Sequence, residues 1–402
     1  LVGSEMCIRD RYMKKKIGLC CCYKQRNYGS QLQSYATTVE MKNRGIDCEV
    51  IQYKKKFTLK FMREAKIWTL FFNRILISER ILRYKKRFIL MFHKDVKHQN
   101  DVRNAKLAQF SKERFTNLSK PCIGHDELEA LGASYDGVFV GSDQLWSPGG
   151  INGNFHNLMF VPDNVPKFSY AASFGVSEIP KGQQKLYKTF LSRLNYISVR
   201  ENAGQKIVKE LTGRDAQVVA DPVMLLTREQ WDEEIKFKRM YDQPYIFAYF
   251  LGKSEENREQ AKKLAELTGL KIVTVHHMDT YNKADVGFGD YAPFEVGPEE
   301  FLNLIRGAEY VCTDSFHGSV FSMIYHKKLM IFKRYADSSK TSKNSRIYSI
   351  CENLGVTHRM FDGNNLNTIT DEIDYDGVDS RIEKIRSESK AYLDKALAFY
   401  WE

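Results

Sequence analysis

Short runs of apolar residues alternate along most of the chain with longer stretches in which apolar residues recur every three or four positions. The short runs have the length and composition of buried strands, and the longer stretches have the period of amphipathic helices. The first series predicts strands at 15–23, 47–53, 135–143 and 167–175 and helices at 31–45, 181–195 and 203–213. Two further apolar segments, 196–202 and 217–225, complete this first series. This alternation is typical of a parallel α/β sheet.

A second series begins after the polar segment 236–244, which ends in Pro244. It predicts strands at 245–252, 270–277, 309–315 and 328–333 and helices at 254–269, 298–308 and 316–327. The sequence therefore predicts two Rossmann-like domains, 13–235 and 236–402, that face each other across a cleft. Their boundary falls within 225–245, and a last helix from Arg381 to Glu402 can pack on either domain.

One segment interrupts the first series and differs from it in composition. Residues 54–120 contain no Gly or Pro and mix aromatic and aliphatic residues with basic ones at helical spacing, which predicts two or three inserted helices. The whole chain of 402 residues has a formal charge of +11. This segment holds 19 Lys and Arg against 5 Asp and Glu, so the basic character belongs to it alone.

The basic insertion is open to several interpretations. As an interfacial helix it would turn Trp68, Phe71, Phe72 and Ile75 toward acyl chains while its cations attract an anionic membrane. As a structural cap it would pack on its own domain and expose a solvated basic face. Nucleic acid is not favoured, because no recognised binding motif accompanies the charge. No uncharged run approaches the roughly 20 residues of a membrane span.

The start of the sequence and its cysteines suggest the compartment. Residues 1–12 precede Met13 and are interpreted as a non-native leader, and nothing near them resembles a secretory signal, so we expect a cytoplasmic protein. The eight cysteines lack the spacing of a disulfide framework or a zinc site. Adjacent His276 and His277 on a predicted strand would point to opposite faces, so no metal site is expected.

Candidate chemistry follows the carboxyl ends of the predicted strands, where α/β sheets place their ligands. Asn27, Gly29 and Ser30 precede a helix whose free amides could hold an anion or a sugar hydroxyl, although the same residues make an ordinary helix start. Asp143 could bind or deprotonate a hydroxyl, or cap a turn. The indole of Trp146 could stack on a sugar or fill the core.

Two further positions offer charge. Arg200 follows the strand ISVRE and suits a carboxylate or phosphate, unless it merely pairs with Glu201 or another neighbour. In VCTDSFHGSV (311–320), Ser315 can cap a helix, Gly318 lets a ligand approach the backbone, and His317 stands in the first turn. An anion that docks at this helix start would meet the helix dipole and the imidazole together. A purely structural histidine is the alternative.

Six segments follow one another in order over nearly the whole chain apart from the basic insertion: NYGSQLQSYA (27–36), DGVFVGSDQLW (136–146), YAASFG (170–175), ISVREN (197–202), ADPVMLL (220–226) and TDSFHGSVFSMIYHKKLMIF (313–332). In this order they resemble the motifs of the polysaccharide pyruvyl transferase family. The resemblance implies a GT-B-like pair of Rossmann domains. It also implies transfer of pyruvate from phosphoenolpyruvate to two hydroxyls of a sugar, or of a lipid-linked glycan, with a ketal and phosphate as products.

The resemblance also assigns roles. Arg200 and His317 fall at positions that bind the donor's anionic groups, with His317 also a candidate acid and Asp143 the ligand or base of the acceptor hydroxyl. The scheme requires no cofactor or metal. Family members often carry Arg where this chain has Ser315. The nearby cations Lys327, Lys328, Lys333 and Arg334 are candidates to replace that charge, and the alternative, favoured for most of them, is a solvated face.

Two other functions fit the same pattern. A GT-B-type glycosyltransferase would hold a nucleotide-sugar diphosphate at the same helix start. A non-catalytic scaffold of cell-surface polysaccharide assembly would use the basic insertion to lie at the inner face of the membrane.

Overall fold

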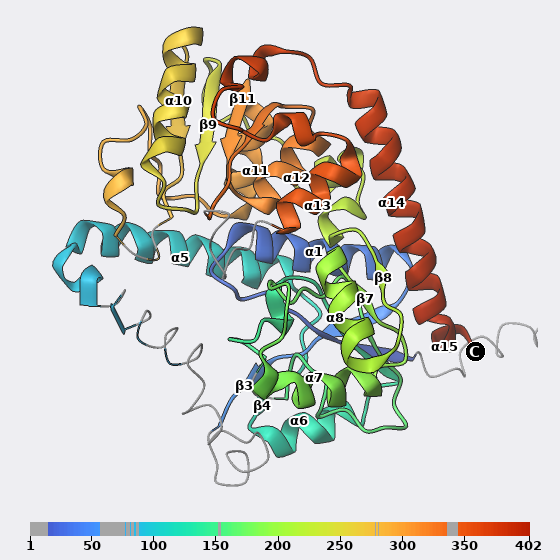
Figure 1. The fold of residues 1–402 in the computed structure, drawn as a ribbon. Coiled ribbons are helices and arrows are strands. Elements are labelled where there is room, and N and C mark those ends of the chain that lie inside the picture. The colour runs from blue at the N-terminus through green and yellow to red at the C-terminus, as the bar shows by residue number, and fades with distance from the viewer. Residues whose placement is uncertain are drawn as a thin grey trace, which may run out of the picture.

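The computed structural model describes residues 15–56, 77, 81, 84–85, 88–151, 154–277, 279, 281–335 and 345–402. Two parallel sheets form the centres of two Rossmann-like domains. Figure 1 shows the first domain below and the second domain above. The predicted leader, 1–12, and the residues Trp68, Phe71, Phe72 and Ile75 of the basic insertion lie outside the described residues.

The first sheet has the strand order β2-β1-β5-β6, and all of its pairs are parallel. Bridges from Phe168 to Tyr196 and from Ala172 to Val199 continue it into the pair β7-β8, and β3 pairs separately with β4. The strands are β1 (Lys16–Cys20), β2 (Asp47–Val50), β3 (Tyr53–Lys54), β4 (Cys122–Ile123), β5 (Gly137–Val140), β6 (Lys167–Ser169), β7 (Ser198–Val199) and β8 (Gln217–Val218).

The second sheet has the order β10-β9-β11-β12 and is also parallel. Its strands are β9 (Tyr245–Tyr249), β10 (Lys271–Thr274), β11 (Tyr310–Thr313) and β12 (Lys328–Ile331). Every residue of β9 and β11 is buried, as expected for parallel strands covered on both faces. The strands end earlier than the apolar runs suggested. His276 and His277, predicted on a strand, therefore lie beyond β10.

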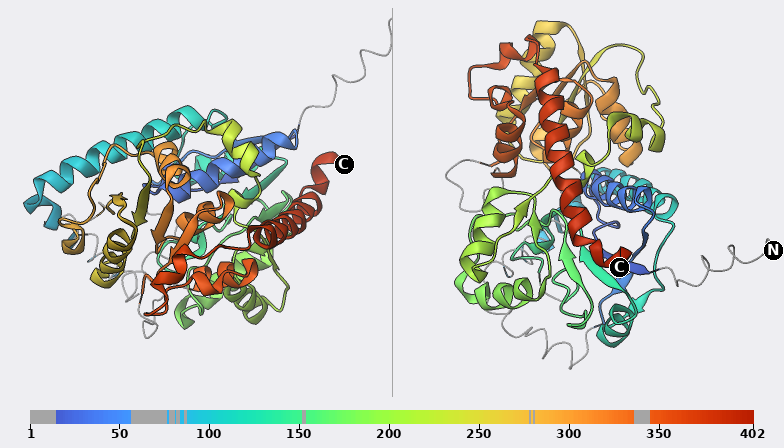
Figure 2. Two further views of the ribbon diagram at one scale, coloured as in Figure 1. Left: turned by 90° about the horizontal axis from the view of Figure 1, so that it is seen from above. Right: turned by 90° about the vertical axis from the view of Figure 1, so that its right-hand side faces the viewer.

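Helices cover both faces of the sheets (Figure 2). They are α1 (Tyr28–Asn43), α5 (Lys94–Arg114), α6 (His125–Gly132), α7 (Lys181–Arg193), α8 (Asn202–Thr212), α9 (Arg228–Glu234), α10 (Glu255–Thr268), α11 (Pro298–Gly307), α12 (Phe316–Ile324), α13 (Ser345–Leu354), α14 (Tyr375–Ala396) and α15 (Ala398–Trp401). Short 3-10 helices are η1 (Gln144–Trp146), η2 (Pro222–Met224), η3 (Lys283–Asp285), η4 (Thr357–Arg359) and η5 (Leu366–Thr370). Among the described residues, no helix has the length and apolar character needed to cross a bilayer.

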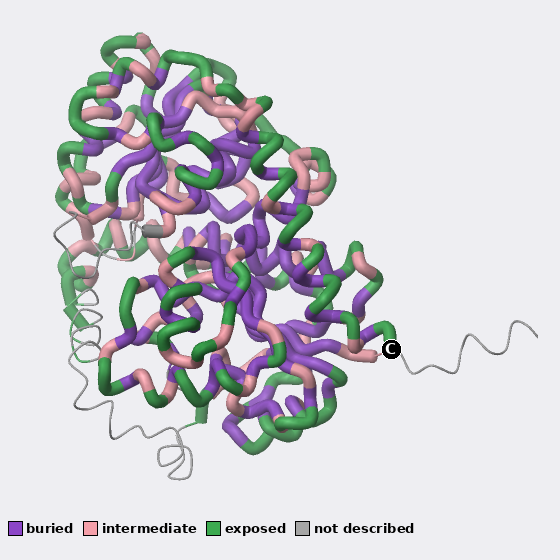
Figure 3. The backbone as a smooth tube through the Cα atoms, turned by 45° about the vertical axis from the view of Figure 1, so that its right-hand side comes forward, coloured by how far each residue is buried: buried purple, intermediate pink, exposed green. Residues whose placement is uncertain are grey.

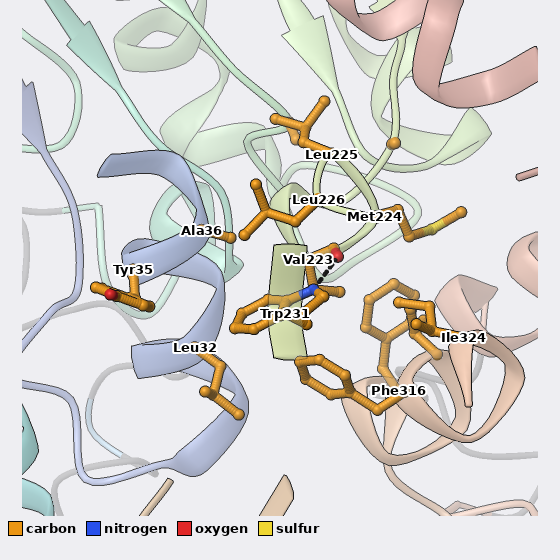
Figure 4. Packing of buried hydrophobic residues seen from close by; sticks show 14 of the residues in the cluster. Leu32, Tyr35, Ala36, Val223, Met224, Leu225, Leu226, Trp231, Phe316 and Ile324 are labelled. Carbon is orange, nitrogen blue, oxygen red and sulfur yellow. Dashed lines mark hydrogen bonds between the residues drawn. The ribbon is translucent and has the colours of Figure 1, made fainter. Parts of the chain in front are cut away.

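The two domains share one hydrophobic core rather than meeting at a polar surface. The indole of Trp231, on α9, packs edge-on against Phe321 of α12 and belongs to the same cluster as Leu32 and Tyr35 of α1 (Figure 4). In Figure 3 buried segments of both domains come together where the domains meet. A core of this kind fixes the position of α12 relative to α1, and both helices begin at the site described below.

Two long helices also connect the domains. α5, the described helix of the basic insertion, packs on α1 and forms ion pairs from Lys106 to Glu300 and from Arg114 to Glu299 of α11. α14 begins on the second domain and descends along the first, where the Tyr392 hydroxyl donates to the carbonyl of Ser169 (Figure 1). The final helix, predicted to pack on either domain, therefore contacts both.

Candidate active site

A cavity of about 440 Å³ lies between the domains at the carboxyl ends of β1, β5 and β11. We call it the interdomain cavity. The first domain lines it with Cys22, Gln25, Asn27, Ser30, Asp143, Gln144, Leu145, Ser147, Gly149, Gly150 and His156. The second domain contributes Leu251, Asp314, Ser315, Phe316, His317, Arg334, Arg346 and Ile347. A ligand held there would contact both domains.

The start of α12 forms one wall of the interdomain cavity. The Ser315 hydroxyl accepts a hydrogen bond from the amide of Gly318 at 3.2 Å, so the helix begins at Phe316 as the sequence predicted. A side chain at Gly318 would lie 2.9 Å from the Thr313 hydroxyl, which leaves no room for a Cβ. Asp314 accepts from the amides of Leu251 and Gly252 at 2.6 and 2.8 Å and so ties the loop after β9 to this helix start.

The start of α1 lies opposite and contacts His317 directly. The Asn27 side chain caps α1 by accepting from the Ser30 amide at 3.0 Å, so Gly29 and Ser30 stand within the first turn rather than before it. A Cβ built on Gly29 would lie 2.1 Å from His317 Nδ1, far inside any real contact. Glycine at position 29 is therefore what lets the imidazole pack against α1.

A buried network of charges lies behind the cavity wall. Arg200 Nη1 donates to the Asp221 carboxylate at 2.5 Å, and His317 Nε2 lies 3.6 Å from the same carboxylate. Arg200 Nη2 lies 3.7 Å from Asp143. Burial alone would raise the pKa of Asp221, but the charges of His317 and Arg200 outweigh it and hold that pKa below its usual range.

Asp143 is held in place from several sides. Its carboxylate accepts from the Ser30 hydroxyl and, at 2.8 Å, from the Gln144 amide. Its backbone has a φ of 81°, a conformation that costs a non-glycine residue energy and that clusters at functional positions. Burial would raise the pKa of Asp143, yet Arg200 and His317 lower it, so the carboxylate stays ionised at neutral pH.

Two further arginines add positive charge to the interdomain cavity. Arg346, in the first turn of α13, places its guanidinium 5.9 Å from the ring centre of Phe316, and Arg200 lies 4.7 Å from the same ring. Burial, and next the charge of Arg200, lower the pKa of Arg346 to about 10, so it remains a cation at neutral pH. Arg334 lines the cavity after β12.

The structure brings most of the predicted residues to this one place. Asn27, Ser30, Asp143, Ser315 and His317 line the interdomain cavity, and Gly29 and Gly318 make the close contacts that shape it. Arg200 lies behind Asp143 and faces a neighbouring cavity.

Other predicted residues lie elsewhere. Trp146 is fully buried, packs on Phe174 and Phe190 and does not line the interdomain cavity. Its indole therefore fills the core, and it is not placed to stack on a sugar in that cavity. Of the cations proposed to compensate for Ser315, Lys327 donates to the carbonyls of Arg306 and Ala308, and Lys328 pairs with Glu309. Lys333 is absent from the cavity lining, and Arg334 is present in it.

Sequence reasoning missed two residues of the network. Asp221 belongs to the motif ADPVMLL, but no pattern distinguished its carboxylate from an ordinary cap of η2, which it also is. Arg346 comes from a different helix, 29 positions beyond His317, and only the tertiary fold brings them to one cavity.

The family model of polysaccharide pyruvyl transferases matches residues 27–334, which extend through parts of both domains and include the residues that line the interdomain cavity except Cys22, Gln25, Arg346 and Ile347. The chain belongs to the polysaccharide pyruvyl transferase family. A search of curated protein sequences finds no match.

Solved structures with a similar fold are sugar enzymes. The UDP-N-acetylglucosamine 2-epimerase of Rickettsia bellii matches with a TM-score of 0.51 at 10% sequence identity, over 97% of each chain. A UDP-GlcNAc 2-epimerase from Neisseria meningitidis, bound to UDP-GlcNAc, matches with a TM-score of 0.45 at 9% identity, over 94% of this chain and 99% of its own. An alpha-glucosyltransferase in complex with UDP gives 0.46 at 9% identity, over 96% and 97%. The architecture is GT-B-like, as predicted, and identities this low show the fold alone.

Proposed function

We propose that this chain transfers the pyruvyl group of phosphoenolpyruvate to two hydroxyls of one sugar in a cell-surface polysaccharide or its lipid-linked precursor. The observation that carries the proposal is the interdomain cavity, where an ionised Asp143 faces His317, Arg334 and Arg346. Phosphoenolpyruvate carries a phosphate and a carboxylate, and cations with a helix start match those anions. The family membership supports the same reaction.

The reaction balances without a further reactant. The methylene carbon gains a proton and becomes a methyl group, both sugar hydroxyl oxygens bond to the adjacent carbon, and the bond from that carbon to the phosphate oxygen breaks. Phosphate leaves with the bonding electrons. The two sugar hydroxyls together lose two protons. One of them balances the proton that the methyl group gains, and the other leaves with the phosphate.

The geometry divides the work among three groups. Asp143 has a lowered pKa, which makes it a weak base but a firm hydrogen-bond acceptor, so its role is to orient the attacking hydroxyl. His317 Nε2 is buried, lies 3.6 Å from the Asp221 carboxylate and makes no hydrogen bond within the described part of the chain. We assign the imidazole the role of protonating the leaving phosphate or the methylene carbon once a substrate is bound. Arg334 and Arg346 bind the donor's anions and stabilise the charge that develops on phosphate.

Phosphate release from phosphoenolpyruvate, measured with a panel of sugar acceptors, tests this function. We expect His317→Ala to lower the rate about 10²–10⁴-fold, the usual contribution of a positioned acid or base. Asp143→Asn should lower it about 100-fold, because the attacking hydroxyl loses its orientation. An unchanged rate in His317→Ala would remove the imidazole from the mechanism. Thermal stabilisation separates the glycosyltransferase alternative: a shift with nucleotide sugars and none with phosphoenolpyruvate would refute pyruvyl transfer.

The basic insertion supports a second proposal, that the enzyme lies at an anionic membrane surface. Ile77, Ile81, Tyr84, Phe88 and Phe92 are helical, exposed, and spaced by four, three, four and four residues, the spacing of one helix face. Exposed apolar side chains within a basic segment suit an interfacial helix. Such a location would bring a lipid-linked acceptor to the cavity.

A further inference from the structure

A second cavity of about 450 Å³ lies beside the interdomain cavity and shares Phe316 and Arg346 with it. It is bounded by the chain that follows β7 and β8 and by helices α13 and α14. Its charged lining consists of four cations and two carboxylates: Arg200, Arg346, Arg381, Lys384, Asp221 and Glu388. The excess of positive charge makes it suited to an anion.

Two of these arginines have buried donor atoms that are unused. Arg200 is 6% exposed, and its Nε and Nη2 have no hydrogen-bond partner within the described chain. The Nε of Arg346 is buried and unpartnered as well. Leaving buried donors without acceptors is costly, and the cost is larger for charged groups. An anion bound in the second cavity would supply the missing acceptors.

The other two cations come from one face of α14. Arg381 and Lys384 are three residues apart, so their side chains project on the same side of the helix. Neither forms an ion pair or a hydrogen bond with any other residue that the structure describes. The guanidinium of Arg381 lies beside Gly355, because a Cβ built on that glycine would be 3.0 Å from its Cζ. Within the described part of the chain it is a cation without an ion-pair partner.

We propose that the second cavity binds a phosphoryl anion. Arginine forks and a lysine are the side chains that proteins use for phosphate, and the fork also fixes its orientation. The cavity is larger than inorganic phosphate requires and falls in the range of about 300–1,000 Å³ that accommodates small organic ligands. The amides of Asn202 and Asn353 and the apolar side chains of Met224, Ile350 and Ile385 line the remaining space.

The phosphoryl group has two chemical sources in a pyruvyl transfer reaction. It belongs either to a phosphorylated sugar acceptor, whose hydroxyls then reach the interdomain cavity past Phe316, or to the phosphate that the reaction releases. Only this choice of source rests on the proposed function. The anion site itself can be measured without phosphoenolpyruvate and without turnover.

Calorimetric titration of the full chain with inorganic phosphate and with glucose 1-phosphate tests the site. Arg381→Gln and Lys384→Gln should each raise the Kd of the bound probe at least tenfold, the effect expected from losing a charged hydrogen bond. Lys262→Gln, which removes an exposed lysine of α10, is the matched control and should leave that Kd unchanged. Arg334→Gln, in the interdomain cavity alone, should weaken binding of phosphoenolpyruvate and spare that of the probe.

The results separate the two sources and the two proposals. Glucose 1-phosphate binding at least tenfold more tightly than phosphate identifies a phosphorylated acceptor, and equal affinities identify the released phosphate. A Kd that is unchanged in both Arg381→Gln and Lys384→Gln, in folded protein, overturns the site, as does the absence of binding by either probe. A further outcome is that the wild type neither binds nor consumes phosphoenolpyruvate, while Arg381→Gln and Lys384→Gln still weaken binding of the probe. In that case the proposed function fails and the anion site stands.

Discussion

At the scale of single residues, the contact between Gly29 and His317 carries the sharpest prediction. Gly29→Ala places a Cβ 2.1 Å from His317 Nδ1, so the imidazole must move away from α1. We expect a loss of about 1–3 kcal/mol in the free energy of unfolding, as for other overpacked positions. Pyruvyl transfer should fall about 100-fold, because a displacement near 1 Å has that effect on catalysis. Chemical denaturation and phosphate release measure the two effects.

Gly182→Ala, in the first turn of α7, is the control for that substitution. A Cβ at this position meets no atom within 4 Å, so we expect the variant to be as stable as the wild type or up to about 1 kcal/mol more stable. If Gly29→Ala and Gly182→Ala have the same stability and the same rate of phosphate release, the close approach of Gly29 to His317 does not determine the position of the imidazole.

Asp221 predicts how stability depends on pH. Its pKa is lowered in the folded state, so the ionised form favours folding. That contribution is fully present above the ordinary Asp pKa of about 3.9 and is lost as the pH falls through the lower, folded value. Asp221→Asn should cost about 3–5 kcal/mol at pH 7, because the buried Arg200 loses its nearer carboxylate and keeps only the more distant Asp143 among its described partners.

The difference in unfolding free energy between Asp221→Asn and the wild type should become smaller as the pH falls from 5 toward 3. Thermal unfolding measured across this pH range can follow it. Asp215→Asn, at a fully exposed carboxylate paired with Lys209, is the control and should track the wild type at each pH. A constant gap for Asp221→Asn would mean that its carboxylate has an ordinary pKa.

The sequence was informative about residues whose role is local. Ser315 could be predicted as a cap because an N-cap acts within three residues of itself. Asn27 was not predicted as one, because the first helix was expected over 31–45 and α1 begins at Tyr28. The roles of Asp221 and Arg346 could not be predicted, since their importance comes from Arg200 and Phe316, which are distant in sequence. Trp146 could be predicted as buried or functional, and only the surrounding rings Phe174 and Phe190 distinguish the two.

At the scale of helices and strands, regular apolar patterns predicted the two parallel sheets correctly. Strand ends were wrong by several residues, because apolar side chains continue past the last ladder hydrogen bond into the buried loops of the site, as at Cys21 after β1. The basic insertion was the harder element: composition predicted helices, but not that α5 would bridge α1 and α11. Its ion pairs with Glu299 and Glu300 depend on a domain that begins more than 100 residues later.

The exposed apolar positions of the insertion predict vesicle binding. The double variant Phe88→Ser/Phe92→Ser removes two rings that are 61% and 70% exposed. Each ring contributes about 1.5–3 kcal/mol when buried, so partitioning into phosphatidylglycerol vesicles should fall at least tenfold. Co-sedimentation at low and high salt measures it, and added salt should weaken the wild-type binding.

Phe237→Ser, at an exposed ring outside the insertion, is the control for the vesicle experiment and should bind vesicles like the wild type. Failure of the wild-type chain to bind anionic vesicles at low salt would leave the insertion as a structural cap between the domains.

At the scale of the whole molecule, the site exists only where the two domains meet. Asp143 comes from the first domain and His317 and Arg346 from the second, so any relative movement of the domains changes the distances among them. The shared core around Trp231 and the two bridging helices α5 and α14 resist such movement. Stability of the domain interface and catalytic geometry are therefore coupled in this fold.

Arg386 is one of the residues through which α14 stabilises the chain between the domains. It is buried, and it donates from Nε to the carbonyl of Met224 at 2.8 Å and from Nη2 to that of Leu226 at 3.3 Å. Arg386→Leu keeps the apolar stem but leaves both carbonyls unpaired. We expect urea denaturation to show a loss of about 1.5–3 kcal/mol, the usual contribution of hydrogen bonds to a charged group.

Lys390→Leu removes a cation from the same helix and provides the comparison. Among the residues that the structure describes, the side chain of Lys390 makes only a 3.7 Å ion pair with Glu40, so its loss should cost about 0–1 kcal/mol. Because Arg386 contacts the chain that carries Asp221 into the site, its substitution should also lower the rate of phosphate release, whereas Lys390→Leu should not. Equal stability and equal rates in the two variants would show that α14 covers the first domain without fixing the geometry of the interface.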